Sequence, residues 1–245
     1  IEGMRDDIQA IADQLISEWI DDGEVDLLNR LCVPLPIYVI ADQLGVPRSE
    51  LTLLKKWSDA STSRLGRLAD EEQQIQNAQD IVEFQHYFAD LIDRMREHPE
   101  DNIISDLANN TIDEGRLLTK PEALGMIQQI LVAGNETSTN AIAGGVVLLI
   151  ENAEEQAKLR ANPDLIPTAV EEILRLETPT SGMWRRATQD TEIDGVAIPE
   201  GSFLMVRYAA GNRDESVFPC AGAMQVDREN ADNHMAFGQG THFCL

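Results

Sequence analysis

Basic residues are scarce in this chain of 245 residues, where 19 lysines and arginines stand against 43 aspartates and glutamates and give a formal net charge of −24. Nucleic acids and anionic membrane surfaces are bound through clustered positive charge, so this balance argues against both as partners. No uninterrupted apolar run approaches the roughly 20 residues that span a bilayer, so we expect no membrane segment in this chain. The three cysteines, Cys32, Cys220 and Cys244, are odd in number and far apart, and they predict no disulfide framework.

Apolar residues make up 43% of the chain, which is enough for a sizeable core. Apolar periodicity and end signals predict helices over 6–19, 35–44, 49–61, 71–98 and 169–176, and the polar stretch 63–70 joins the third to the fourth. After Pro179 the pattern changes, because an Asp-Gly turn within 192–198 predicts a β-hairpin and 202–208 predicts a further strand. The sequence therefore predicts a mainly α protein with a small β portion.

A longer helical pattern begins with a capping box formed by Thr119 and Glu122, and it continues to Ile150. If continuous, this helix would be about 45 Å long. Its middle, 133–140, contains Gly134 and several polar residues that are weak helix formers, and Glu136 is costly to bury without partners. One interpretation is a helix break, a hinge or two shorter helices. The other is a locally opened helix that offers a carboxylate and hydroxyls to a small reactant.

Cys244 lies in a glycine-containing loop that begins at Phe237. Gly238 and Gly240 can adopt positive φ or let a flat group approach the backbone, and His242 adds a hydrogen-bond donor two residues from the sulfur. A thiolate presented in this way is a candidate metal ligand or nucleophile. The alternative is an ordinary glycine-rich turn with a partly buried cysteine.

Glu172 and Arg175 are three residues apart within the helix predicted over 169–176, so they share one face of it. Pairs of this kind are usually solvated and contribute little to stability. Taken alone, this pair indicates nothing beyond surface charge.

Taken together and in this order, the three segments resemble the cytochrome P-450 superfamily. The family's central-helix pattern, Ala/Gly-Gly-x-Asp/Glu-Thr, matches 133–137, and its Glu-x-x-Arg pair matches Glu172 and Arg175. Its haem loop, Phe-x-x-Gly-x-His/Arg-x-Cys-x-Gly, is matched by Phe237, Gly240, His242 and Cys244, with the closing glycine position beyond the last residue. The stretches 185–188 and 210–214 also look like soluble bacterial members, so the resemblance covers essentially the whole chain.

The resemblance implies a single domain over 1–245 with a cytochrome P-450-like helical body, a long central helix and a small β portion. It also implies an internal fragment that lacks an N-terminal part and the C-terminal helix and strands. The helices on either side of 63–70 correspond to the family's mobile lid over the substrate entrance.

For the chemistry, the resemblance implies haem b with Cys244 as the iron ligand in the loop of Phe237 and Gly240. His242 and Arg185 would pair with the haem propionates, although the adjacent Arg186 could replace Arg185. On the opposite side Glu136 and Thr137 would relay protons while Gly134 leaves room for oxygen. Glu172 and Arg175 would form a buried structural ion pair.

The function implied is a cytoplasmic haem-thiolate monooxygenase that inserts one oxygen atom of O2 into a C–H or C=C bond of an apolar small molecule. Its electrons would come from NAD(P)H through a ferredoxin-type partner. The candidate pocket residues are Leu131, Val132, Ala133, Thr180, Ser181, Gly182, Met183 and Trp184.

Three alternatives stay open. The first is a peroxide-driven peroxygenase or peroxidase with the same cofactor. The second is a non-catalytic haem-binding or sensor module, or a remnant that no longer binds haem. The third is a zinc site at Cys244 and His242, for which the sequence offers no second cysteine-histidine cluster.

Overall fold

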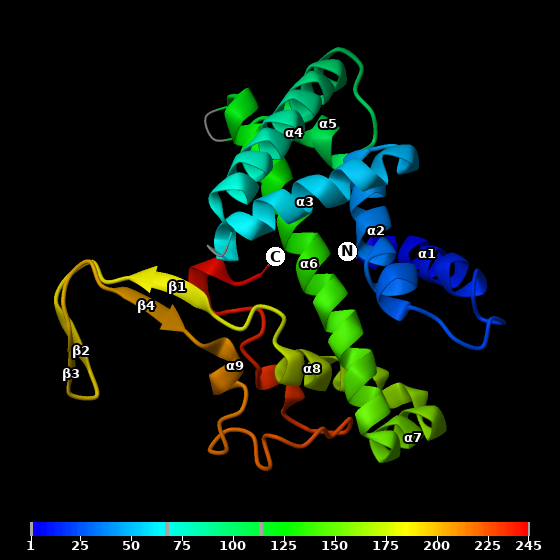
Figure 1. The fold of residues 1–245 in the computed structure, drawn as a ribbon, viewed down its shortest axis with the longest axis vertical. Helices are drawn as coiled ribbons and strands as arrows, with labels where there is room; N and C mark the ends of the chain where they lie inside the picture. The colour runs from blue at the N-terminus through cyan, green and yellow to red at the C-terminus, as the bar shows by residue number, and fades with distance from the viewer. Residues whose placement is uncertain (1, 67–68, 113–114, 245) are drawn as a thin grey trace. The chain divides into compact units, whose positions relative to one another are not determined.

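The computed structural model describes residues 2–66, 69–112 and 115–244, and these are mainly helical, as the sequence predicts (Figure 1). The chain divides into two compact units, 1–139 and 140–245. The boundary falls inside the long helix α6 (Lys120–Glu151) and not in a linker. The single domain expected over 1–245 stays a prediction.

Unit 1 consists of helices that pack around one apolar core. The helices are α1 (Arg5–Ser17), α2 (Pro34–Leu44), α3 (Leu51–Gly66), α4 (Glu71–Glu97), α5 (Ile103–Asn109) and the first part of α6. At the centre Trp57 of α3 meets Phe84 and Phe88 of α4 at ring-centroid distances of 5.9 Å each, in edge-to-face contacts. Cys32 is also buried, and this burial raises the pKa of its thiol.

Helix α4 begins and ends where the sequence predicts, because Asp70 caps it by accepting a hydrogen bond from the Gln73 backbone N–H at 2.9 Å. The predicted end of α3 near residue 61 is wrong, because the helix continues to Gly66. The Asn77 side chain of α4 donates to the Ser63 hydroxyl at 2.9 Å and ties the extra turn in place. Residues 67–68 of the predicted connection lie outside the described residues. Helix α5 was not predicted.

Helix α6 starts at the predicted capping box, where the Thr119 backbone N–H and hydroxyl both donate to the Glu122 carboxylate at 2.8 Å. The interpretation as a break, a hinge or two shorter helices is wrong, because α6 is α-helical without interruption from 120 to 151. Tertiary hydrogen bonds offset the weak propensity of its middle. Asn135 donates to the Ser58 hydroxyl of α3 at 2.9 Å, and the Thr139 hydroxyl donates to the Cys32 carbonyl at 3.0 Å.

Unit 2 combines the rest of α6 with short helices and two small sheets. Its elements are α7 (Ala153–Ala161), α8 (Ile166–Glu177), β1 (Met183–Arg186), β2 (Thr191–Ile193), β3 (Val196–Ile198), β4 (Phe203–Val206), α9 (Tyr208–Gly211) and the turns η6 (Ala231–Asn233) and η7 (Gly240–His242). Strand β1 pairs antiparallel with β4, and β2 pairs with β3 in the predicted hairpin. At its turn Asp194 and Gly195 both have positive φ, 49° and 79°, as a two-residue hairpin turn requires. Helix α7 was not predicted.

Glycines let α6 and α8 pack closely within unit 2. A Cβ atom added at Gly145 would lie 2.9 Å from Cγ2 of Ile173, which is closer than carbon atoms normally approach. The contact therefore leaves no room for a side chain at this position of α6.

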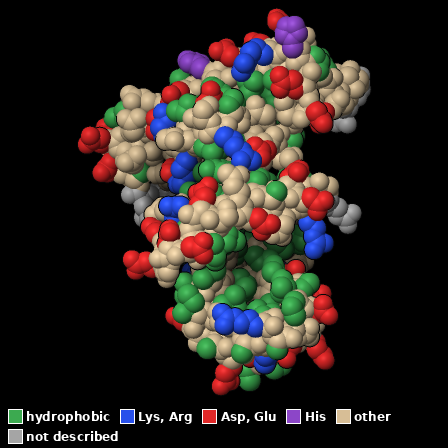
Figure 2. Space-filling view, turned by 90° about the vertical axis from the view of Figure 1, so that its right-hand side faces the viewer, with side chains coloured by type: hydrophobic (Ala, Val, Ile, Leu, Met, Phe, Trp, Pro, Cys, Tyr) green, Lys and Arg blue, Asp and Glu red, His purple; other side chains and the backbone are tan. Residues whose placement is uncertain are grey.

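Figure 2 shows acidic side chains over much of the face in view, in keeping with the net charge of −24. No helix in the described part of the chain combines the length and apolar character needed to cross a lipid bilayer.

Candidate functional site

The loop of Cys244 has the backbone that its glycines predict. Gly238 and Gly240 both take positive φ, 73° and 75°, and the loop closes where the Cys244 backbone N–H donates to the Phe237 carbonyl at 3.0 Å. The Cys244 thiol is exposed. Phe237 and Phe243 are exposed by 39% and 56%, so apolar surface accompanies the thiol on both arms of the loop.

A second element of unit 2 meets this loop through Tyr208. Arg185 of β1 donates to the Tyr208 hydroxyl at 3.4 Å, and a Cβ atom added at Gly238 would lie 3.7 Å from the same hydroxyl. Arg185 and His242 are both exposed, as is Arg186, whose guanidinium lies over the Phe203 ring. The Tyr208 hydroxyl thus lies close to both Arg185 and the backbone of Gly238 in the cysteine loop.

Glu172 and Arg175 of α8 are completely buried, with side-chain exposures of 0% each. Arg175 donates from Nε and Nη2 to the two carboxylate oxygens at 2.7 and 2.9 Å. Its Nη1 donates to the carbonyls of Asn212 and Ala221 at 2.7 and 2.8 Å. Such bidentate, fully hydrogen-bonded pairing is what makes a buried charge tolerable.

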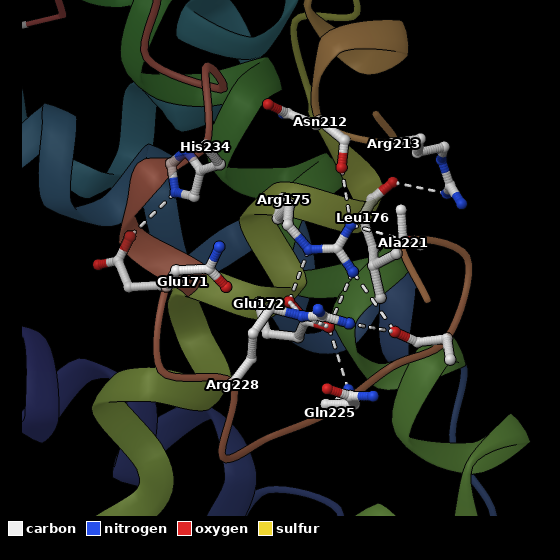
Figure 3. Close-up of polar contacts among 12 residues, drawn as sticks. Glu171, Glu172, Arg175, Leu176, Asn212, Arg213, Ala221, Gln225, Arg228 and His234 are labelled. Atoms are coloured by element: carbon white, nitrogen blue, oxygen red, sulfur yellow. Dashed lines mark hydrogen bonds and ion pairs between the residues drawn. The ribbon is translucent and has the colours of Figure 1, made fainter. Parts of the chain in front are cut away.

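Arg228 is the third charged residue of this network, and sequence reasoning missed it. Its Nε atom donates to Glu172 at 3.0 Å (Figure 3). Its Nη1 atom donates to the Pro219 carbonyl at 2.9 Å. The backbone N–H of Gln225 also donates to Glu172, at 3.0 Å. One carboxylate therefore fixes the segment 225–228, which precedes the cysteine loop, to α8. No spacing rule links residue 228 to residue 172, so the sequence gives no indication of this contact.

Glu136 and Thr137 lie in the continuous part of α6 and are half-buried. The expected local opening of the helix is absent there. Instead the Thr137 hydroxyl donates to the Ala133 carbonyl at 2.6 Å, which leaves the lone pairs of its oxygen free to accept. Gly134 has a packing role, because a Cβ atom added to it would lie 3.1 Å from Cδ1 of Ile40 in α2.

The predicted pocket residues differ in their exposure. Leu131 is completely buried in the core of unit 1, so it is not available to a ligand and its assignment to a pocket wall is wrong. Ala133 is exposed and Val132 is half-buried. After α8, Met183 and Trp184 are exposed by 50% and 58%, Ser181 is also exposed, and the neighbours at 180 and 182 are half-buried.

The residues of unit 2 fit a haem. An exposed thiol in a glycine loop provides the iron ligand, the exposed rings of Phe237 and Phe243 provide apolar contact, and Arg185 and His242 provide donors for carboxylates. Within the described ranges no group of three or more His, Cys, Asp or Glu side chains is arranged to hold a metal ion by itself.

A mainly helical protein with an exposed cysteine in a glycine loop, and with a buried Glu-Arg network that ties a helix to the segments before that loop, has the features of a haem-thiolate protein. The "Cytochrome P450" family model matches residues 49–245. The chain is 36% identical to "Cytochrome P450 monooxygenase PikC" of Streptomyces venezuelae, over 100% of this chain and 58% of that protein. It is 35% identical to "6-deoxyerythronolide B hydroxylase" of Saccharopolyspora erythraea, over 100% and 59%.

Solved structures agree. The crystal structure of P450BioI in complex with an acyl carrier protein ligated to hexadec-9Z-enoic acid matches with a TM-score of 0.93 and 32% identity, over 99% of this chain and 62% of that one. The chain therefore belongs to the cytochrome P-450 family, and it spans about three fifths of the length of these relatives.

Proposed function

We propose that this chain is the haem-binding part of a haem-thiolate monooxygenase. The complete protein would insert one oxygen atom of O2 into a C–H or C=C bond of an apolar small molecule and reduce the other atom to water. The observation that carries this proposal is the exposed Cys244 thiol, held in a loop with two positive-φ glycines.

Cys244 would supply the thiolate, which the loop backbone would shield from water once haem is bound. Backbone N–H groups in a glycine-rich loop hydrogen-bond to a sulfur without admitting water, which keeps the thiolate deprotonated. Arg185 and His242 would hold the propionates, with Arg185 oriented by the Tyr208 hydroxyl. A haem whose iron is held by a thiolate supplies dioxygen activation, because electron donation from the sulfur favours cleavage of the O–O bond.

Glu136 and Thr137 favour O2 over peroxide as the oxidant. Cleavage of O2 needs protons delivered into an apolar pocket, and a carboxylate beside an alcohol can pass them through ordered water. The Thr137 oxygen suits this task, because its own proton is engaged at Ala133 and its lone pairs remain to accept a hydrogen bond. A protein driven directly by peroxide has no need of this pair.

For the substrate we propose an apolar small molecule. Met183 and Trp184 offer exposed apolar surface after α8. The names of relatives point the same way: one is a steroid C26-monooxygenase and another is a 6-deoxyerythronolide B hydroxylase. The electrons would come from NAD(P)H through a ferredoxin-type partner.

The test uses the full-length haem protein. Reduction under carbon monoxide is expected to give the strongly red-shifted absorption band of a thiolate opposite the gas, and Cys244→Ala should abolish it. Cys220→Ala is the matched control, because Cys220 is also exposed and should be dispensable. Persistence of the band in Cys244→Ala would overturn the ligand assignment. Turnover with peroxide alone, at the rate reached with a reductase, would favour the peroxygenase instead.

A further inference from the structure

His234 lies three residues before the cysteine loop and is buried, with a side-chain exposure of 2%. Its Nδ1 atom accepts a hydrogen bond from the Ala236 backbone N–H at 3.1 Å. Because a backbone N–H can only donate, Nδ1 carries no proton and Nε2 carries it. Nε2 lies 2.9 Å from the Glu171 carboxylate of α8 and donates to it (Figure 3). One ring therefore links α8 to the backbone of residue 236.

Asn212 makes a second link to the same segment. It is completely buried, and its Oδ1 atom accepts from the Met235 backbone N–H at 2.6 Å. Its side-chain nitrogen Nδ2 donates to the Thr178 hydroxyl at 2.8 Å, and its backbone carbonyl accepts from Arg175 at 2.7 Å. Asn212 is thereby fixed at two points to α8 and to the residue that ends it, and it holds Met235 by a third hydrogen bond.

The segment 235–236, held by these two side chains, supports the cysteine loop through backbone hydrogen bonds. The Met235 carbonyl accepts from the Gly238 backbone N–H at 2.9 Å, and the Phe237 carbonyl accepts from the Cys244 backbone N–H at 3.0 Å. The His234 ring also packs on the Phe237 ring, with centroids 5.5 Å apart. A shift at 235 or 236 would pass through these bonds to Cys244.

No helix or strand provides acceptors for these two backbone N–H groups, since residues 234–239 belong to neither. Met235 and Ala236 are half-buried, and backbone donors shielded from water need partners, which two side chains supply here. We propose that His234 and Asn212 are positioning residues that hold the cysteine loop at the place where its thiolate meets the haem iron. This inference rests on the proposed role of Cys244.

Two substitutions at His234 separate its two hydrogen bonds. Asparagine keeps an acceptor close to the position of Nδ1 and so retains the bond from Ala236, but it cannot reach Glu171. Glutamine keeps a donor close to the position of Nε2 and so retains the bond to Glu171, but it loses the backbone bond. If the backbone bond holds the loop, His234→Asn should stay closer to the native protein than His234→Gln does.

The first measurement is the reduced carbon monoxide spectrum of the full-length haem protein. In His234→Gln the share of haem with the red-shifted thiolate band should fall by about half or more, because removing a residue that supports a metal ligand typically weakens metal binding about tenfold or more. His234→Asn, which loses only the bond to Glu171, should lower the share no more than Glu171→Ala does. Glu171→Ala, at a carboxylate that is 38% exposed, should lower the share less than His234→Gln does while leaving the fold intact.

The second measurement is hydrogen exchange of peptides covering 235–244, which needs no turnover. Exchange should be about tenfold faster in His234→Gln than in the native protein. Glu171→Ala should also make exchange faster, by a smaller factor. If the native full-length protein binds haem without a red-shifted band, the proposed function fails. The exchange measurement then still decides whether the loop depends on His234.

The control is Asn77→Ala, which removes a buried amide from unit 1 that bonds Ser63 and Gln73 at 2.9 and 2.8 Å. It should lower the melting temperature and leave both readouts unchanged. The proposal is overturned if His234→Gln matches the native protein in both measurements. It is equally overturned if Asn77→Ala lowers the thiolate share as much as His234→Gln at the same loss of melting temperature.

Discussion

The guanidinium Nε of Arg228 lies 3.0 Å from the carboxylate of Glu172, although 56 residues separate them in the chain. With Arg175 the carboxylate thus has two buried cationic partners, and its loss would leave both without a counter-charge. The network is a structural centre of unit 2, because it joins α8 to the segments that lead to the cysteine loop.

We expect Glu172→Ala to lower the free energy of unfolding by about 3 to 5 kcal/mol, because it leaves the buried charges of Arg175 and Arg228 without a partner. The full-length variant should be poorly folded and retain little haem. Chemical denaturation and the haem content of the purified protein measure both effects. Lys120→Ala is the control, since its pair with Asp93 is exposed and should contribute at most about 1 kcal/mol. Equal losses in the two variants would contradict the role of the network.

Two glycines of α6 should respond to alanine in opposite directions. A Cβ atom at Gly125 meets nothing within 4 Å, whereas one at Gly145 would lie 2.9 Å from Cγ2 of Ile173. Gly125→Ala should stabilise the protein by about 0.5 to 1 kcal/mol, through helix propensity alone. Gly145→Ala should destabilise it by about 1 to 3 kcal/mol, because α8 must move. Thermal unfolding of both variants tests the pair, and a stabilised Gly145→Ala would contradict the close packing of the two helices.

The sequence predicts those features whose causes are local. The start of α4 follows from Asp70 and the apolar pattern after it, and the hairpin turn follows from Asp194 and Gly195. The order of three motifs also predicts the family, which the comparisons confirm.

Features that depend on distant partners were not predictable. The continuity of α6 depends on Ser58 and on the Cys32 carbonyl, which lie 77 and 107 residues from their partners in the helix. Helical spacing places Glu172 and Arg175 on one face, but their burial depends on carbonyls of residues 212 and 221. For the same reason no pattern in the sequence indicates that Arg228 joins them.

The capping box of α6 should make stability depend on pH. Hydrogen bonds from Arg116 and then from Thr119 lower the pKa of Glu122 from 4.5 to about 2. A carboxylate with a lowered pKa stabilises the folded state above its unfolded pKa, and this contribution is lost as the pH falls toward the folded value. Glu122→Gln should therefore lower the urea midpoint at pH 6, and the difference from the native protein should shrink as the pH falls from about 4.5 toward about 2. A difference that is constant with pH would exclude the carboxylate as its source.

The hydroxyl of Thr137 should control how efficiently electrons are used and not whether haem binds. In the full-length enzyme Thr137→Ala should leave haem content unchanged, while less product forms for each NAD(P)H consumed and peroxide is released. The reason is that the hydroxyl, half-buried on α6 and bonded to the Ala133 carbonyl at 2.6 Å, would accept and pass protons without holding the cofactor.

Two variants make this last test specific. Thr137→Ser keeps a hydroxyl at the same position and should retain most of the native coupling of product to NAD(P)H. Thr139→Ala removes a hydroxyl from the same helix that donates to the Cys32 carbonyl at 3.0 Å, so it should affect stability and leave coupling unchanged. Product, NAD(P)H and peroxide are measured together for several substrates. Native coupling in Thr137→Ala with every substrate would remove the hydroxyl from the proton path, and equal uncoupling in Thr139→Ala would assign the effect to a disturbed helix.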